Sequence, residues 1–166
     1  MTVAGFEIVT RLGSTTGSAL YRARRALTQA PALLKLPLSP DTAPSQLPAM
    51  RREYDLLRSL PLPGIARPVD LIEDRESGSL TVVLAPFDGE SLEVALRSAP
   101  FSWLEALRTM RALAQMLVGL HAARVVHKDL RPSNVLFDRE HWAVCLVDAS
   151  VAAIGADSLA PAPDAW

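Results

Sequence analysis

The chain has 166 residues, of which 49% are apolar and 21% charged, and its formal net charge is −1 at pH 7. This length and composition predict one globular domain with its own hydrophobic core and exclude a disordered chain. The charges are interspersed without a long basic run, and no apolar stretch approaches the roughly 20 residues that cross a bilayer, so neither nucleic acid nor a membrane is an expected partner.

Residues 1–86 predict mainly β-structure. Residues 1–13 lack the basic segment followed by a long apolar segment of a signal peptide, so we expect a cytoplasmic chain. Turn-forming residues, including a hairpin candidate at 75–79, separate short apolar-rich runs that are typical of strands. These runs are residues 6–13, 18–25, 31–36, 66–74 and 80–86.

One helix is expected to interrupt these strands. Pro48 suits its first turn, and Met50, Tyr54 and Leu57 then recur at the i, i+4, i+7 spacing of a helix face. The proline-rich residues 37–48 are interpreted as the linker that leads from the third strand into this helix.

The C-terminal half begins with a long predicted helix at residues 102–123. Ser102 is a suitable N-cap, and one face of the helix carries Trp103, Leu107, Met110, Ala114, Leu117 and His121. Strands at 134–137 and 143–148 should follow, with the only cysteine, Cys145, as a buried strand thiol. Strands with one helix, then a long helix and a small hairpin, predict an α+β chain in two lobes.

Residues 127–134, with the sequence HKDLRPSN, carry side chains suited to phosphoryl transfer. Asp129 can orient a hydroxyl nucleophile or accept its proton. The amide oxygen of Asn134 is a hard ligand for a divalent cation, and Arg131 can offset charge on a moving phosphoryl group. Together these three residues make a phosphoryl-transfer set.

The same stretch resembles the protein kinase catalytic loop, H-R-D-L-K-P-x-N, with Lys128 in place of its arginine. The resemblance implies that Lys35, on the third strand, holds the phosphates of ATP. It implies that Glu53, on the predicted helix, pairs with this lysine. Asp148 resembles the aspartate of the D-F-G position, which would bind Mg²⁺ together with Asn134.

The resemblance also implies a hinge at residues 86–90, between a small lobe at 1–85 and a partial large lobe at 91–166. Backbone groups from Ala85 to Phe87 would hydrogen-bond adenine, with Leu84 as the gatekeeper. The other residues implied to contact the nucleotide are Leu12, Gly13, Leu20, Leu33, Leu136 and, near the ribose, Ser91.

Several positions depart from the family pattern. Thr15 and Ser18 stand where the second and third glycines of the phosphate-binding turn are expected, so the turn should cover the phosphates less closely. Leu33 replaces the alanine of the adenine roof and could crowd the purine. The D-F-G tripeptide is replaced by residues 148–150, so the phenylalanine that packs beneath the helix of Glu53 is missing.

Only eighteen residues follow Asp148, so we expect a complete small lobe, an incomplete large lobe, and apolar surface left exposed on the helix at 102–123. The resemblance implies a serine/threonine protein kinase that uses ATP and Mg²⁺ on a protein substrate. The loop also resembles kinase domains at the N-terminus of large bacterial sensor proteins. The alternative is a pseudokinase-like regulatory module that binds a nucleotide or a partner protein. A small-molecule kinase of the aminoglycoside type fits the loop and hinge less well.

Overall fold

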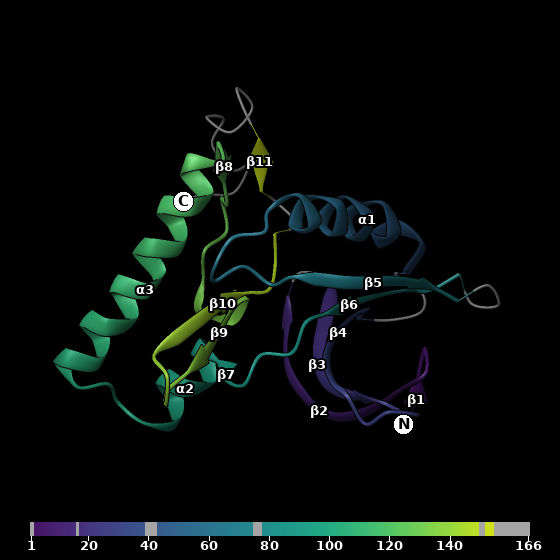
Figure 1. Cartoon of the computed structure of the whole chain (residues 1–166), viewed down its shortest axis with the longest axis horizontal. Coiled ribbons are helices and arrows are strands. Elements are labelled where there is room, and N and C mark those ends of the chain that lie inside the picture. The colour runs from purple at the N-terminus through teal and green to yellow at the C-terminus, as the bar shows by residue number, and fades with distance from the viewer. Residues whose placement is uncertain (1, 16, 39–42, 75–77, 150–151, 155–166) are drawn as a thin grey trace.

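The computed structural model describes residues 2–15, 17–38, 43–74, 78–149 and 152–154. Two parts lie side by side (Figure 1): an N-terminal sheet with one helix, and a C-terminal part with two helices and short strands. The predicted α+β architecture is confirmed. No helix in the described residues is both long enough and apolar enough to cross a membrane.

The N-terminal part is built on a sheet whose strand order is β1-β2-β3-β4-β6-β5, six strands among the described residues. Every neighbouring pair is antiparallel. Each of the five runs predicted as strands falls on one strand from β2 to β6. The bounds are β1 Thr2–Val3, β2 Phe6–Thr15, β3 Ser18–Arg25, β4 Pro31–Pro37, β5 Pro68–Glu73 and β6 Leu80–Leu84.

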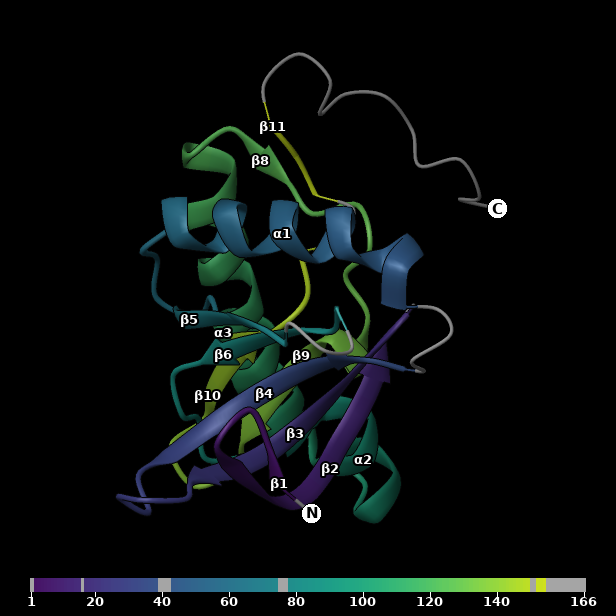
Figure 2. The ribbon, with the colours of Figure 1, turned by 90° about the vertical axis from the view of Figure 1, so that its right-hand side faces the viewer.

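Helix α1, Ala43–Ser59, lies across the sheet and contacts β5 and β6 (Figure 2). Its predicted start near Pro48 is wrong, because the helix begins five residues earlier and contains the proline. Pro48 lies near the N-terminal end, where it removes one i→i−4 hydrogen bond without stopping the helix. Met50 and Leu57 are buried, as their spacing predicted.

The C-terminal part contains α2, Leu92–Ser98, and α3, Trp103–Ala122. The predicted N-cap of α3 is confirmed: Ser102 Oγ accepts from the Glu105 N–H at 3.3 Å, and the Glu105 carboxylate accepts from the Ser102 N–H at 2.7 Å. This reciprocal pair satisfies two main-chain donors at the start of the helix. The remaining strands are β7 Glu90–Ser91, β8 Val125–Val126, β9 Val135–Asp138, β10 Ala143–Leu146 and β11 Ala153–Ile154.

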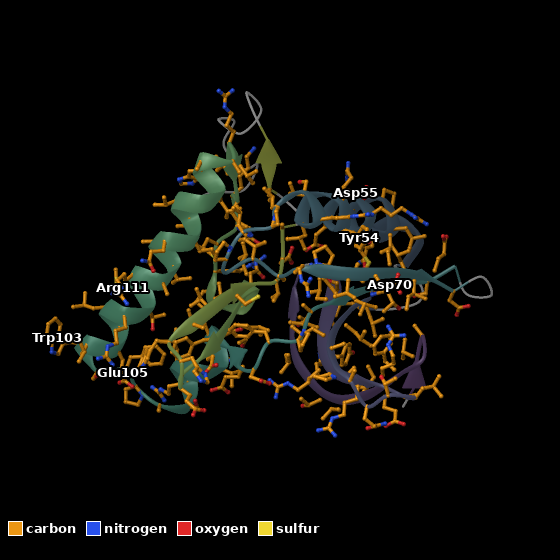
Figure 3. All side chains as sticks on the ribbon, in the orientation of Figure 1. Tyr54, Asp55, Asp70, Trp103, Glu105 and Arg111 are labelled. Atoms are coloured by element: carbon orange, nitrogen blue, oxygen red, sulfur yellow. The ribbon has the colours of Figure 1, made fainter. Side chains whose placement is uncertain are left out.

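Two opposite faces of α3 meet different surroundings. Thr109, Met116 and Leu120 are buried on the side where the helix contacts β8 and β10. Most of the predicted apolar face is exposed instead: Trp103 and Met110 are 76% and 63% exposed, and Trp103 projects outward at the helix end (Figure 3), whereas Leu117 of the same face packs against the hydrophobic core. The predicted exposure of apolar surface on this helix is therefore confirmed.

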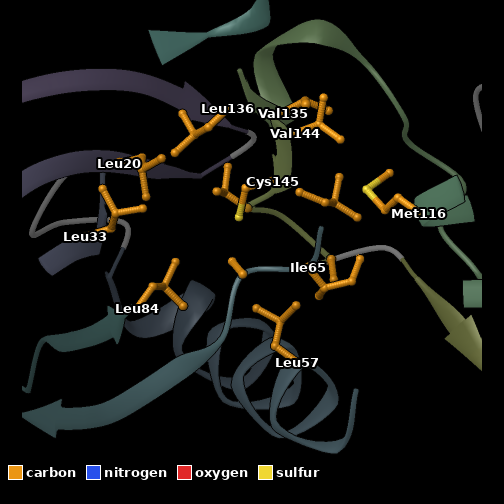
Figure 4. Packing of buried hydrophobic residues seen from close by; sticks show 14 of the residues in the cluster. Leu20, Leu33, Leu57, Ile65, Leu84, Met116, Val135, Leu136, Val144 and Cys145 are labelled. Atoms are coloured by element: carbon orange, nitrogen blue, oxygen red, sulfur yellow. The ribbon is translucent and has the colours of Figure 1, made fainter. Parts of the chain in front are cut away.

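One hydrophobic cluster joins the two parts of the molecule. It contains side chains from β3, β4 and β6 on one side and from β9, β10 and α3 on the other (Figure 4). Cys145 lies in it as predicted, and burial raises the pKa of its thiol to about 12. A smaller cluster covers the opposite face of the sheet and contains Phe6, Ala23, Ala32, Leu34 and Val83.

Candidate active site

Three charged side chains meet between the two parts of the molecule. Lys35 on β4 donates to both carboxylate oxygens of Glu53 on α1, with Nζ–O distances of 2.5 and 2.7 Å. Asp148, just after β10, places Oδ1 3.3 Å from the same ammonium. All three residues are buried, and Lys35 and Glu53 form the pair that the family resemblance implied.

The electrostatics of this group favour a further cation. Burial raises the pKa of Glu53 above its ordinary value, and the nearby carboxylate of Asp148 raises it further, whereas the charge of Lys35 lowers it. One ammonium therefore faces two carboxylates away from water. A divalent cation beside Asp148 would balance the excess negative charge.

The main chain after Asp148 is held from both sides. The Ala149 N–H donates to Glu53 Oε1 at 2.9 Å, and the ring nitrogen Nε2 of His127 is hydrogen-bonded to the Asp148 carbonyl. His127 Nδ1 accepts from the Asp129 N–H at 3.3 Å, so the ring links the Asp148 carbonyl to the start of the loop and orients it. Ala149 lies in the core cluster where the family has phenylalanine, and Ser150 lies outside the described residues.

The loop at residues 127–134 is held by contacts among its own side chains. Asp129 Oδ2 accepts from Arg131 Nη2 at 2.5 Å and from Asn134 Nδ2 at 3.1 Å, and Asn134 Nδ2 also lies 2.9 Å from the Asp129 carbonyl oxygen. Within the described part of the chain no hydrogen bond uses Asp129 Oδ1, which leaves one carboxylate oxygen for a substrate hydroxyl. Lys128 has a φ of 64°, a left-handed conformation that these contacts must hold in place.

Asn134 has the properties expected of a metal ligand. It is 0% exposed, and its Oδ1 is a buried acceptor with no partner in the described structure. Such an orphaned oxygen is costly unless something binds it. The described residues contain no group of three or more His, Cys, Asp or Glu side chains able to hold a metal. An Mg²⁺ ion held by Asn134 and Asp148 would therefore need phosphate and water oxygens as well, which is how Mg²⁺ is often bound.

The predicted hinge, residues 86–90, and Ala85 before it offer main-chain groups beside an apolar layer. The Ala85 N–H donates to the Arg67 carbonyl at 2.8 Å. No hydrogen bond among the described residues uses the Phe87 N–H, so it can bind a heterocycle. Ser91 is buried and its hydroxyl caps α2 by accepting from the Val94 N–H at 3.2 Å, so the group predicted to lie near a ribose is already engaged.

The turn between β2 and β3 depends on a glycine that is displaced from the family position. Gly13 pairs with Leu20 in the sheet, and a Cβ added at Gly13 would meet no atom within 4 Å. Gly17 has a φ of +96°, and a Cβ there would lie 2.7 Å from Gln46 Nε2. The Gly17 carbonyl accepts from the Leu38 N–H at 3.0 Å, which ties the turn to the end of β4. The side chains of Thr15 and Thr16 lie outside the described residues.

Two residues of the site region were missed in the sequence. Arg22 on β3 donates from Nη2 to the Gly89 carbonyl of the hinge at 2.6 Å. Gly89 itself passes so close to β9 that a Cβ would lie 2.5 Å from the Phe137 carbonyl oxygen. The alternation of β3 could have placed Arg22 on the same face as Leu20, but only the fold brings its guanidinium to the hinge.

The family model described as "Protein kinase domain" matches residues 6–158. The chain therefore belongs to the protein kinase domain family. The order of its elements and the grouping of Lys35, Glu53 and Asp148 agree with the resemblance seen in the sequence.

Curated relatives carry serine/threonine kinase names. A "probable serine/threonine-protein kinase" of Arabidopsis thaliana is 32% identical over 80% of this chain and 23% of its own length. A second from the same plant is 30% identical over 82% of this chain and 19% of its length. The "probable serine/threonine-protein kinase MARK-C" of Dictyostelium discoideum is 24% identical over 83% of this chain and 18% of its length. The chain thus spans about a fifth of each relative, and none of the three is bacterial.

Proposed function

We propose that this chain carries the phosphoryl-transfer site of a serine/threonine protein kinase, which moves the γ-phosphoryl group of ATP to a protein hydroxyl. The observation that carries the proposal is the buried group of Lys35, Glu53 and Asp148, next to a loop that presents Asp129 and the orphaned oxygen of Asn134. An ion pair with only a structural role would not require the polar side chains of Asp129 and Asn134 beside it.

Each residue then has a distinct role in the reaction. Lys35, oriented by Glu53, binds the phosphates that precede the transferred group. Asn134 and Asp148 hold Mg²⁺, which neutralises phosphate charge when it is bound. Asp129 orients the substrate hydroxyl and accepts its proton, while Arg131, which is 2.5 Å from Asp129, can turn toward the transferred phosphoryl group.

The base and ribose of the nucleotide would lie along the hinge. Ala85 and Phe87 would supply main-chain hydrogen bonds, and Ser91 would lie near the ribose. The other residues proposed to contact the nucleotide are Leu12, Gly13, Leu20, Leu33 and Leu136. A cytoplasmic location and an origin in a bacterial sensor protein belong to the same proposal, and they rest on the sequence alone.

A second candidate is a regulatory, pseudokinase-like module that binds a nucleotide or a partner protein without transferring phosphate. Two features favour this module: Leu33 is buried, and Thr15 and Ser18 replace two glycines of the phosphate-binding turn. Both functions share the Lys35 group, so only a measurement of transfer separates them.

The test is transfer of labelled phosphate from ATP to a mixture of serine- and threonine-containing peptides, with the 166-residue chain and Mg²⁺. Asp129→Asn should reduce the rate by about 10²- to 10⁴-fold and leave Mg·ATP binding, measured by calorimetry, nearly unchanged. Equal rates for the variant and the wild type would contradict the proposed role of Asp129. Magnesium-dependent ATP binding without any transfer would support the regulatory module instead.

A further inference from the structure

The apolar residues that line the base end of the proposed nucleotide site are all buried. Leu33 and Leu136 are each 1% exposed, and Leu20 is 4% exposed. Leu20 and Leu33 come from the N-terminal sheet and Leu136 from β9, and all three belong to one hydrophobic cluster (Figure 4). Almost no water-sized space therefore lies against any of these side chains.

A planar base cannot enter between these buried side chains in the arrangement that the structure shows. A ring stacked between two apolar side chains needs carbon–carbon contacts of about 3.5 Å on each face, so the upper and lower side chains must be about 7 Å apart. Water, which is smaller than a purine, finds almost no room beside Leu33 or Leu136. Binding of a base therefore requires these side chains to move apart.

Leu33 occupies the position that a base would need. Side chains alternate along β4: Leu34 belongs to the cluster on the far face of the sheet, whereas Leu33 and Lys35 point toward the site. The two-residue step from Lys35 to Leu33 is roughly 6.8 Å along the strand. Leu33 pairs with Leu84, the last residue of β6 before the hinge, so it fills the space between the phosphate end and the hinge.

A contact at the hinge holds this arrangement closed. Arg22 stands opposite Leu33 in the pairing of β3 with β4, and its guanidinium donates to the Gly89 carbonyl at 2.6 Å. Because β3 and the hinge are tied together here, the sheet cannot lift away from β9 without breaking this hydrogen bond.

We propose that Leu33 is the residue that sets nucleotide affinity and base selectivity in this chain, because it fills the slot for the base. The wild-type chain then binds nucleotides chiefly through the phosphates, at Lys35 and the Mg²⁺ ligands, and discriminates poorly among bases. This inference rests on the proposed function, since it assumes that phosphates bind at Lys35.

The test compares three proteins by calorimetry with Mg·ATP, Mg·GTP and Mg·tripolyphosphate. Leu33→Ala should bind Mg·ATP at least about 10-fold more tightly than the wild type, with unchanged affinity for tripolyphosphate, because only the base gains contacts. Leu34→Ala is the matched control: it removes the same three carbons from the same strand on the opposite face, and it should bind all three ligands as the wild type does.

The affinities of the wild-type chain alone provide a second test. Its affinities for Mg·ATP, Mg·GTP and Mg·tripolyphosphate should agree within about threefold. If Leu33→Ala does not fold, Leu33→Val replaces it, because this change removes less volume. Its affinity for Mg·ATP should also rise, but by a smaller factor.

Three results would overturn the proposal, and they differ in what they mean for the proposed function. Equal ATP affinity in the wild type and the Leu33 variants would show that Leu33 does not block the base. Wild-type ATP binding far tighter than tripolyphosphate binding would show the same. In both cases the proposed function would survive. If neither Mg·ATP nor Mg·tripolyphosphate binds any of the folded proteins, the phosphate site itself is absent, and both proposals fail together.

Discussion

The carboxylate of Glu53 accepts a hydrogen bond from the main-chain N–H of Ala149 at 2.9 Å, across 96 residues of sequence. The same oxygen is 2.5 Å from Lys35 Nζ, so one carboxylate joins α1, β4 and the segment that follows β10. This contact uses the main chain, and it therefore does not depend on which side chain follows Asp148. It explains how the site stays assembled with alanine in place of the family's phenylalanine.

Lys35→Met should destabilise the fold much more than loss of a surface ion pair. The change leaves Glu53 and Asp148 as two buried carboxylates without their shared ammonium, and breaking a buried pair costs about 3–5 kcal/mol. Urea unfolding at pH 7 measures the difference. The control is Arg97→Met, which removes an exposed pair with Glu93 and should cost less than about 1 kcal/mol. Equal losses in the two variants would show that the buried group contributes little.

The raised pKa of Glu53 predicts a specific pH dependence of stability. A carboxyl whose pKa is higher in the folded state binds its proton more tightly there, so its contribution is fully present below the unfolded value near 4.5. That contribution is lost as the pH rises from this value through the folded pKa. Glu53→Gln removes the titration, so the free energy of unfolding of the variant should fall less over this pH range. Parallel pH curves for the two proteins would contradict the assignment.

Gly17→Ala should weaken both the fold and nucleotide binding. Its φ of +96° is unfavourable for alanine, and the added Cβ would lie 2.7 Å from Gln46 Nε2. We expect a loss of about 1–3 kcal/mol, measured by urea unfolding, together with weaker Mg·ATP binding. Gly5→Ala is a matched control with a φ of +80° and no atom within 4 Å, so it should show the conformational cost alone. Equal losses would mean that the contact with Gln46 does not matter.

The exposed apolar side chains of α3, which are Trp103, Leu104, Leu107, Met110 and Val118, should cause association or binding of hydrophobic dyes. Met110→Glu and Val118→Glu replace side chains that are 63% and 69% exposed, so both should reduce dye binding and the apparent mass in light scattering without lowering stability. Leu120→Glu on the buried face should instead unfold the chain. Unchanged association in the first two variants would show that another surface is responsible.

The local pattern of the sequence was sufficient for most elements and for the chemistry of the loop. The strands β2 to β6, β9 and β10 follow from short apolar-rich runs bounded by turn residues, and the start of α3 follows from Ser102, because these signals act within a few residues. The roles inferred for Lys35, Glu53 and Asp148 depended on a family resemblance, and the structure brings the three side chains together.

Only the tertiary structure decided the long-range relationships. The start of α1 was predicted too late because Pro48 was interpreted as the first turn, whereas the helix begins at Ala43 and contains this proline. Both faces of α3 carry apolar residues, so periodicity could not say which face meets β10. The closure of Leu33 in the same cluster as Leu136 and the hydrogen bond from Ala149 to Glu53 join segments about 100 residues apart. Such contacts depend on how the two parts of the molecule dock. The free energy of docking comes from the burial of many side chains taken together, so no short stretch of sequence predicts it.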